Sequence, residues 1–493
     1  MRKRITVGLV TLIAVVAAAC MLCACSTGET EKRSVYTIDA ALSADNVLTA
    51  DVTCEYVNNT DVPLGEIKFH LYPNAYRKDA KYKPVAESRE SQAYPNGKSY
   101  ATLDIASVTV NGEAAEITVT GEDCDVLSVA LKAELEPTDV ATVNVKYALK
   151  LPNVRHRLGY TDKSVNLANF YPIACVYRDG GFVADPYCEI GDPFFSECAD
   201  YNVKLTAPKT YECAATGVVS DKTESEDGSS VTYDIKAQNV RDFAAVLGAY
   251  QKMSGLSGST IVNYMYYDDA DPESALKAAI DSIGIFGEMF GAYPYTEYTV
   301  VQTGFIQGGM EYPGLSMISD AVNGDTERDV IVHETAHQWW YGLVGNDEVK
   351  YPWLDEALAE YSTMMFYEKA EGYKYTFGAK RADALGAYTL YCETFKNNGL
   401  GDTSMTRKIS EYDGETEYSY MTYVKGALML DDIRNTVGTD AFVAGLKKYC
   451  ADNMYGIAEP QDLIGAMEKT SKRQLNALFE SWLNGNVKLY SSH

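Results

Sequence analysis

Between about residues 36 and 247, hydrophobic and polar residues alternate in short runs. The clearest runs are 48–53, 141–146 and 201–205. Alternation with a period of two places apolar side chains on one face of a strand and polar side chains on the other. Because asparagine, glycine and proline separate the runs, the pattern predicts an antiparallel β domain with one solvent-exposed face.

The pattern changes after residue 248, where apolar residues recur at helical spacing. Asp271 followed by Pro272 is typical of a helix start, because aspartate caps the first turn and proline fits the first helical position. Residues 274–290 continue this helix. A strand is predicted at 298–302, and further helices are predicted at 329–343, 355–369, 423–436 and 475–483.

Together these patterns predict a multidomain protein of the β plus α/β class. We expect an N-terminal antiparallel β domain over residues 35–247 and a mostly helical domain over 248–493. A chain of 493 residues is long enough for each domain to bury a core of its own.

The first residues are typical of an export signal. Three basic residues open the chain, and residues 5–22 are almost all apolar. The sequence Leu-Cys-Ala-Cys at positions 22–25 resembles the lipobox of bacterial lipoproteins. This resemblance implies a signal peptide over residues 1–24, a lipid on the sulfur of Cys25 and a polar tether over 25–34.

The same segment allows two alternatives to this anchor. Cys20 and Cys23 are poorer lipidation candidates, because neither has leucine three positions upstream. The apolar run is also about as long as the 20 residues that a bilayer-spanning helix needs, so it can be an uncleaved anchor. Both the lipid and the helix predict a folded part outside the cytoplasm, anchored to a bacterial membrane.

Net charge limits the class of partner. The chain has 69 acidic and 43 basic side chains, and its formal net charge is -26. Nucleic acids and anionic membrane surfaces both favour clustered lysine and arginine, so this composition excludes nucleic acid as the main partner. Cleavage after residue 24 would remove three positive charges and make the mature chain more acidic.

Eight cysteines follow Cys25. An exported chain can pair them, but buried reduced cysteines are also common packing residues, and the sequence does not decide between the two. No Cys-x-x-Cys occurs after residue 25, which argues against a thiolate zinc site.

The strongest chemical signal is the sequence His-Glu-Thr-Ala-His at positions 333–337. Residues four apart on a helix project from one face, so His333 and His337 can bind one zinc ion. Glu334 lies beside them and can accept a proton from a water molecule. The alternative is a helix with two ordinary histidines and a surface glutamate.

A catalytic zinc site needs a third protein ligand. Glu356 follows His337 after eighteen residues, which is enough for a loop that returns an antiparallel helix to the metal. Glu360 lies one helical turn further and either orients a metal ligand or is a solvated carboxylate.

This set, His-Glu-x-x-His followed after eighteen residues by a glutamate within Trp-Leu-x-Glu, resembles the aminopeptidase N type of zinc peptidases, peptidase family M1. The resemblance extends to Gly-Gly-Met-Glu at 308–311, which is similar to the family's Gly-x-Met-Glu-Asn motif, and to Tyr-Val-Lys-Gly-Ala at 423–427. It implies a thermolysin-like catalytic domain over 248–493. The helical C-terminal domain of longer members has no counterpart, so we expect a more open cleft.

The resemblance also implies roles for single residues. Gly308, Gly309 and Met310 would hold the substrate backbone, and Glu311 would bind the free α-ammonium through a charge-assisted hydrogen bond. Glu334 would act as the base. The hydroxyl of Tyr423 would stabilise the oxyanion. The ligands of one Zn²⁺ per chain would be His333, His337 and Glu356.

Some positions depart from the family pattern. Tyr312 replaces the usual asparagine and is followed by Pro313. Asp355 and Ala357, on either side of Glu356, replace the common asparagine and glycine.

Other signals are weaker. Glu189, in the β domain, is a candidate for amine binding, and the alternative is a plain surface carboxylate. Residues 191–195 predict a turn and a hydrophobic anchor, and the tryptophans at 339–340 predict core packing. His70 and His156 lack a partner at ligand spacing and are expected to be structural or exposed.

The sequence therefore predicts a zinc aminopeptidase that hydrolyses peptides with a free N-terminus. One alternative is a zinc endopeptidase with the same metal site. Against it stands Glu311, whose charge would remain unpaired opposite a blocked peptide. An alternative of another class is a non-catalytic peptide-binding lipoprotein, although no ligand or base of the motif is missing.

Overall fold

The computed structural model describes residues 32–395, 398–399 and 401–485. The predicted signal peptide over 1–24 and the predicted lipidation site Cys25 lie outside these residues. Within them, no helix combines the length and the apolar character that are needed to cross a bilayer.

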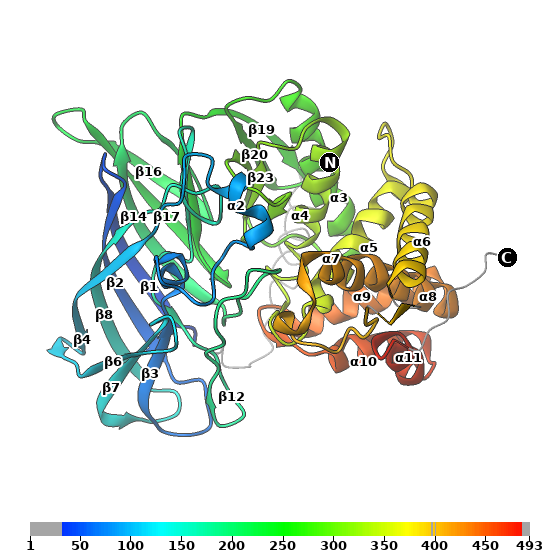
Figure 1. The fold of residues 1–493 in the computed structure, drawn as a ribbon, viewed down its shortest axis with the longest axis horizontal. Helices are drawn as coiled ribbons and strands as arrows, with labels where there is room; N and C mark the ends of the chain where they lie inside the picture. Colours follow the sequence, from blue (N-terminus) through cyan, green and yellow to red (C-terminus); the bar gives the residue numbers. More distant parts are fainter. Residues whose placement is uncertain (1–31, 396–397, 400, 486–493) are drawn as a thin grey trace, which may run out of the picture. The chain divides into compact units, whose positions relative to one another are not determined.

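The alternating N-terminal sequence forms an eight-stranded sheet (Figure 1). Along β2 the side chains alternate between buried and more accessible positions, as the period-two pattern predicts. All neighbouring strands are antiparallel except β1 and β14, which run parallel, so the expectation of a purely antiparallel sheet was wrong for this pair. A parallel pair needs a long crossover, and most of the β domain connects these two strands. The strand order is β16 (Val218–Glu224), β17 (Ser230–Val240), β14 (Ala199–Pro208), β1 (Val35–Leu42), β2 (Val47–Val57), β8 (Val140–Lys150), β4 (Thr102–Val110) and β5 (Glu113–Ala114).

Two four-stranded sheets share the hydrophobic core of this domain. Aromatic side chains link the layers: the rings of Tyr36 and Tyr201 stack at 5.0 Å, and Tyr171 packs edge-on against both. The first sheet has the order β15 (Glu212–Ala215), β18 (Ala244–Gly248), β10 (Ser164–Ala168) and β9 (Leu158–Tyr160). The second has the order β11 (Ile173–Ala174), β3 (Leu64–His70), β7 (Val126–Leu135) and β6 (Ile117–Thr120).

The following region begins with a five-stranded sheet and continues with helices, so the predicted order of a β domain and then a mostly helical domain is confirmed. Asp271 caps α3 (Pro272–Phe290) by accepting a hydrogen bond from the backbone N–H of Ser274. The sheet has the order β19 (Gln251–Ser257), β20 (Thr260–Tyr266), β21 (Glu297–Thr303), β23 (Leu315–Ser319) and β22 (Gly309–Met310). The domain boundary at residue 247 stays a prediction.

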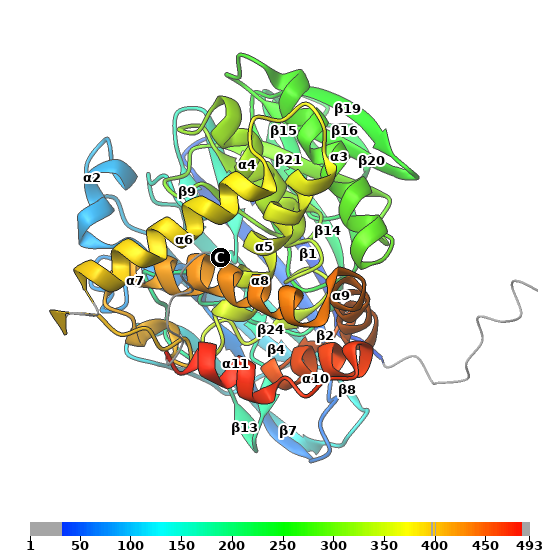
Figure 2. The ribbon, with the colours of Figure 1, turned by 90° about the vertical axis from the view of Figure 1, so that its right-hand side faces the viewer.

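Helices enclose a second hydrophobic core (Figure 2). They are α3, α4 (Gly324–Ala336), α5 (Trp353–Lys369), α6 (Phe377–Thr394), α7 (Gly414–Ser419), α8 (Gly426–Val437), α9 (Thr439–Asn453), α10 (Pro460–Ser471) and α11 (Asn476–Leu483). A π-helix over Tyr420–Lys425 precedes α8, so the predicted helix at 423–436 has a different first turn.

The predicted helix at 329–343 is wrong at both ends, because α4 begins at Gly324 and ends at Ala336. Beyond it the chain folds into tight turns in which Tyr341 has a φ of 131°. Arg241, from the β domain, holds this segment by donating a hydrogen bond of 2.9 Å to the carbonyl oxygen of Tyr341. A tertiary contact therefore holds the turns that follow α4.

Several smaller predictions can also be compared with the structure. Trp339 and Trp340 are buried, as expected for core packing. His70 and His156 are also buried and are therefore structural. All eight cysteines after Cys25 are reduced, and six of them are buried.

Candidate metal centre and active site

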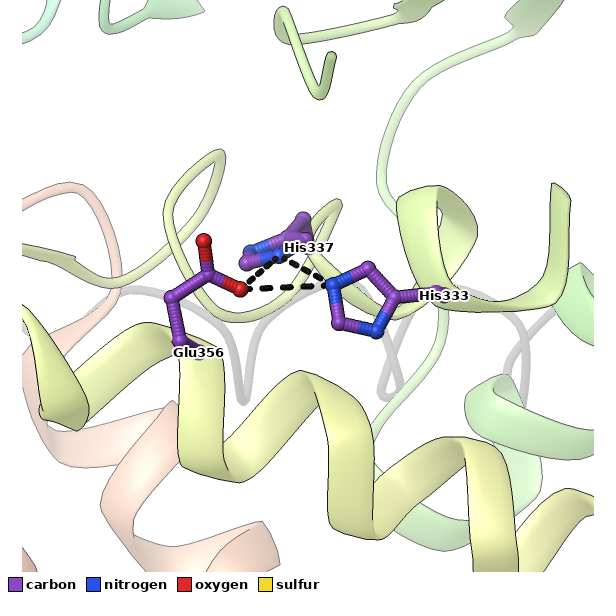
Figure 3. Close-up of side chains that lie close together, drawn as sticks. All are labelled: His333, His337 and Glu356. Carbon is purple, nitrogen blue, oxygen red and sulfur yellow. Dashed lines mark hydrogen bonds and ion pairs between the residues drawn. The ribbon is translucent and has the colours of Figure 1, made fainter. Parts of the chain in front are cut away.

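Two helices bring together the three predicted metal ligands (Figure 3). His333 lies in the last turn of α4, His337 directly follows that helix, and Glu356 lies in the first turn of α5. The two Nε2 atoms are 3.1 Å apart. Glu356 Oε2 lies 3.3 Å from Nε2 of His333 and 3.2 Å from Nε2 of His337.

This triangle of donor atoms fits one zinc ion. Ligands at the usual zinc distances of about 2.0–2.1 Å stand about 3.3 Å apart in a tetrahedron, so three such atoms occupy one face and leave one position open. Two imidazoles and one carboxylate are also a common donor set of catalytic zinc sites. The pKa of Glu356 falls to about 2: burial opposes this change, but the adjacent imidazoles outweigh it.

Further contacts orient the two imidazoles. Nδ1 of His337 lies 2.9 Å from the carbonyl oxygen of Trp340, which leaves Nε2 free to bind a metal. Nδ1 of His333 lies 3.4 Å from Oε2 of Glu360. Glu360 in turn lies 3.5 Å from the ammonium of Lys380. Of the two interpretations of Glu360, the geometry therefore favours the one in which it orients a ligand.

Glu334 points toward strand β22. Its side chain is buried, and Oε2 has no hydrogen-bond partner within the described ranges. A Cβ added to Gly309 would stand 2.3 Å from Oε1 of Glu334, so glycine is required for this close approach. Burial raises the pKa of Glu334 to about 7, although the neighbouring imidazoles act in the opposite direction.

Glu311 directly follows strand β22 and is also buried, with 4% of its surface exposed. Its Oε1 has no hydrogen-bond partner in the part of the chain that the structure describes. Burial and then the negative charge of Asp192 raise the pKa of Glu311. Tyr312, which replaces the family's asparagine, is buried and donates a hydrogen bond of 3.1 Å to Asn169.

An ion pair between Asp192 and Arg157 forms another wall of the cavity. Arg157 also donates hydrogen bonds to the carbonyl oxygen of Gly191, at 3.0 Å, and to the sulfur of Met310, at 3.1 Å. The segment 191–195 is the expected turn with buried phenylalanines, but the sequence analysis did not place Asp192 or Arg157 in the site. The available signal was an aspartate two residues before a pair of phenylalanines.

Tyr423 reaches the metal ligands from the π-helix. Its hydroxyl donates a hydrogen bond to Oε1 of Glu356. Its ring stacks on the ring of His333 with a centroid distance of 5.7 Å. The irregular first turn before α8 therefore places a phenolic donor at the metal centre.

One cavity of about 270 Å³ is lined by the three metal donors and by Arg157, Asp192, Glu311, Glu334, Glu360 and Tyr423. Gly308 and Gly309 form part of its wall, and Glu189 lies in the wall with an exposed side chain. Eight of the nineteen lining residues are acidic. A cavity with this charge and a three-donor metal site is suited to bind and hydrolyse a small cationic substrate.

A second cluster of possible donors lies behind the first. Carboxylate oxygens of Glu311 and Asp355 come within 4.8 Å of each other and of a ring nitrogen of His337. Since Nδ1 of His337 contacts Trp340, the two clusters would compete for Nε2. The set with His333 and Glu356 has donor atoms 3.1–3.3 Å apart, which is the spacing of ligands around one zinc ion.

Comparison with known proteins gives the same family as the sequence motifs. Residues 274–482 match the peptidase family M1 domain. The chain is 27% identical over 227 residues to an aminopeptidase N of Streptomyces lividans, which is 43% of this chain and 26% of that protein. It is 30% identical over 158 residues to the tricorn protease-interacting factor F2 of Thermoplasma volcanium, covering 31% and 19% of the two chains. The chain thus spans about a quarter or less of the length of these relatives.

A similar fold occurs in a solved structure. The M1 zinc metallopeptidase from Deinococcus radiodurans superposes with a TM-score of 0.64, and the match covers 92% of this chain and 94% of that chain. The sequence identity is 17%, so this likeness establishes the fold.

Proposed function

We propose that the chain is a zinc-dependent aminopeptidase that removes the first residue of peptides, and the match of residues 274–482 to the peptidase family M1 domain supports this. The single observation that carries this proposal is the shared cavity. It joins three metal donors, a buried carboxylate beside them and a second buried carboxylate, Glu311, whose Oε1 has no hydrogen-bond partner in the described ranges.

His333, His337 and Glu356 would hold the zinc ion. Zinc bound by these side chains supplies a Lewis acid that polarises the scissile carbonyl and lowers the pKa of a water molecule. Glu334 accepts the proton of the attacking water at its carboxylate and then donates it to the leaving amine. The hydroxyl of Tyr423 donates a hydrogen bond to the oxyanion, which is typically worth about 3 kcal/mol of the barrier.

Glu311 gives the site its preference for peptide ends. A buried carboxylate without a partner is costly, and a substrate ammonium would pair with it by a charge-assisted hydrogen bond. A peptide with a blocked end would leave this charge buried and unpaired. The edge strand of Gly309 and Met310, together with Gly308, would hold the substrate backbone beside it.

The test uses matched substrates. Aminoacyl anilides should be hydrolysed, and their N-acetyl forms should react at least 100-fold more slowly. Equal rates would favour an endopeptidase with the same metal site. Binding of peptides without any hydrolysis by the zinc-loaded protein would instead favour a peptide-binding lipoprotein.

We also propose an extracytoplasmic location with a lipid anchor on Cys25. The support is the basic and apolar start of the chain and the lipobox-like sequence at 22–25. Cells grown with radiolabelled palmitate should incorporate label into the wild-type protein and not into Cys25→Ser. Equal labelling of the two would remove this proposal.

A further inference from the structure

We infer that the cavity selects peptides whose first residue is lysine or arginine. This inference rests on the proposed function, because the side chain of the first residue then lies next to the ammonium that Glu311 would bind. Its basis is the distribution of charge and of apolar surface within the cavity.

Most acidic residues of the cavity wall already have a partner or a proposed role. Asp192 pairs with Arg157, and Glu415 lies 3.2 Å from the guanidinium of Arg89. Both Asp329 and Glu360 lie close to the ammonium of Lys380. Glu334 and Glu356 have their proposed tasks at the metal.

Glu189 differs from these residues. Its side chain is exposed, and no ion pair joins it to a cation in the described part of the chain. A cavity of about 270 Å³ is roughly 8 Å across, so Glu189 lies within about one Debye length of any substrate side chain in it. It can therefore attract a positive charge on the first residue.

Glu311 provides the second observation. It is 4% exposed, and its Oε1 lacks a hydrogen-bond partner among the described residues, so the cavity holds a buried acceptor that a substrate ammonium would satisfy. Glu189 lines the same cavity and adds a second carboxylate to its wall. Lysine or arginine at the N-terminus carries two positive charges, and they can match these two carboxylates.

Few apolar side chains line the wall. Val330 is its only aliphatic lining residue within the described residues. A leucine side chain would therefore lie mostly against polar and charged side chains and gain less hydrophobic free energy than in an aliphatic pocket. Charge, rather than apolar area, should decide which first residue is preferred.

The experiment compares kcat/KM for the anilides of arginine, lysine, alanine, leucine and glutamate on the zinc-loaded protein. We expect arginine and lysine to exceed alanine and leucine at least tenfold, with glutamate lowest. Raising the salt concentration from 20 to 500 mM should reduce the arginine-to-alanine ratio, because salt screens the attraction.

The variant Glu189→Gln should lower the arginine-to-alanine ratio at least threefold. The matched control is Glu226→Gln, which removes the same charge from the exposed turn between β16 and β17 and should leave the ratio unchanged. Alanine or leucine as the best substrate would overturn the inference. So would an equal loss for all substrates in Glu189→Gln, which would assign Glu189 to the amine. Failure to hydrolyse any free anilide would contradict the proposed function itself.

Discussion

The eight-stranded sheet and the α4–α5 helix pair differ in the burial of their acidic side chains. In the sheet, Asp39 points to solvent, and Asp51 lies opposite Lys146 on the neighbouring strand, 2.9 Å from its ammonium. In the helix pair, Glu334 and Glu356 are buried. These carboxylates of the sheet remain accessible to water, whereas these carboxylates of the helix pair are removed from it.

This difference shows where the sequence was constrained by something other than stability. A buried carboxylate without a counter-charge destabilises a fold. Local rules are most often broken at functional sites, where the cost is offset elsewhere. Here a bound zinc ion and a substrate ammonium would provide the missing positive charge. The following predictions test this contrast, beginning with the largest expected effect.

Removal of the metal should have the largest effect. Chelation followed by dialysis should abolish hydrolysis and lower the melting temperature, because zinc binds the folded state and leaves negative charge unpaired when it is removed. Added zinc should restore both, whereas added magnesium should not, because magnesium prefers oxygen ligands. An unchanged melting temperature and full activity after complete removal would contradict the metal site.

Glu334→Gln should lower kcat about 1000-fold and retain one zinc per chain, because the amide keeps the shape but cannot accept the proton. Zinc content is measured by elemental analysis beside the kinetics. The control is Glu327→Gln, a buried glutamate of the same helix that accepts a hydrogen bond from Tyr264. Near-normal turnover in Glu334→Gln would show that another group is the base.

Tyr423→Phe should lower kcat about 100-fold with little change in KM, because the lost hydrogen bond acts on the oxyanion. Tyr420→Phe is the matched control, since Tyr420 belongs to the same π-helix and packs on Tyr391 at 5.1 Å. Equal losses in the two variants would indicate that the π-helix has only a structural role.

Lys425→Met should reduce the free energy of unfolding by about 2 kcal/mol. The fully buried ammonium of Lys425 donates hydrogen bonds to the carbonyl oxygens of Thr403 and Trp482, and methionine would leave these oxygens without that donor. Denaturant unfolding of the zinc-loaded protein measures the change. A difference below 0.5 kcal/mol would contradict it.

Lys146→Ala in the sheet should have the smallest effect, below about 1 kcal/mol, because its ion pair with Asp51 is exposed to solvent. The same denaturant experiment compares it with Lys425→Met. A larger loss in Lys146→Ala than in Lys425→Met would contradict the expected difference between an exposed and a buried charged side chain.

The sequence predicted those features that depend on short spacing. Asp271 and Pro272 gave the start of α3, because capping is local. The four-residue spacing of His333 and His337 gave two donors on one side of a helix. The motif around Glu356 supplied the third donor, and the structure brings the three atoms within 3.3 Å of one another.

Contacts between distant segments were not predictable in this way. The segment that follows α4 is held by Arg241, which lies far from it in the sequence. The pairing of Asp192 with Arg157 likewise joins separate elements. For Glu360 the sequence left two interpretations open, and its contact with His333 favours one of them. Neither the hydrophobic periodicity nor the spacing of motif residues along the chain indicates which of these distant side chains come into contact.

The sequence by itself determined the order of the two domains, the metal donor set and the acidic character of the protein. Each follows from residue type and near-neighbour spacing, which the backbone geometry of strands and helices converts into faces. Only the tertiary structure decided which carboxylates lie together, which have a counter-charge and which face the cavity. Burial and pairing depend on the packing of segments that are remote in the chain, and these decide the chemistry of each carboxylate.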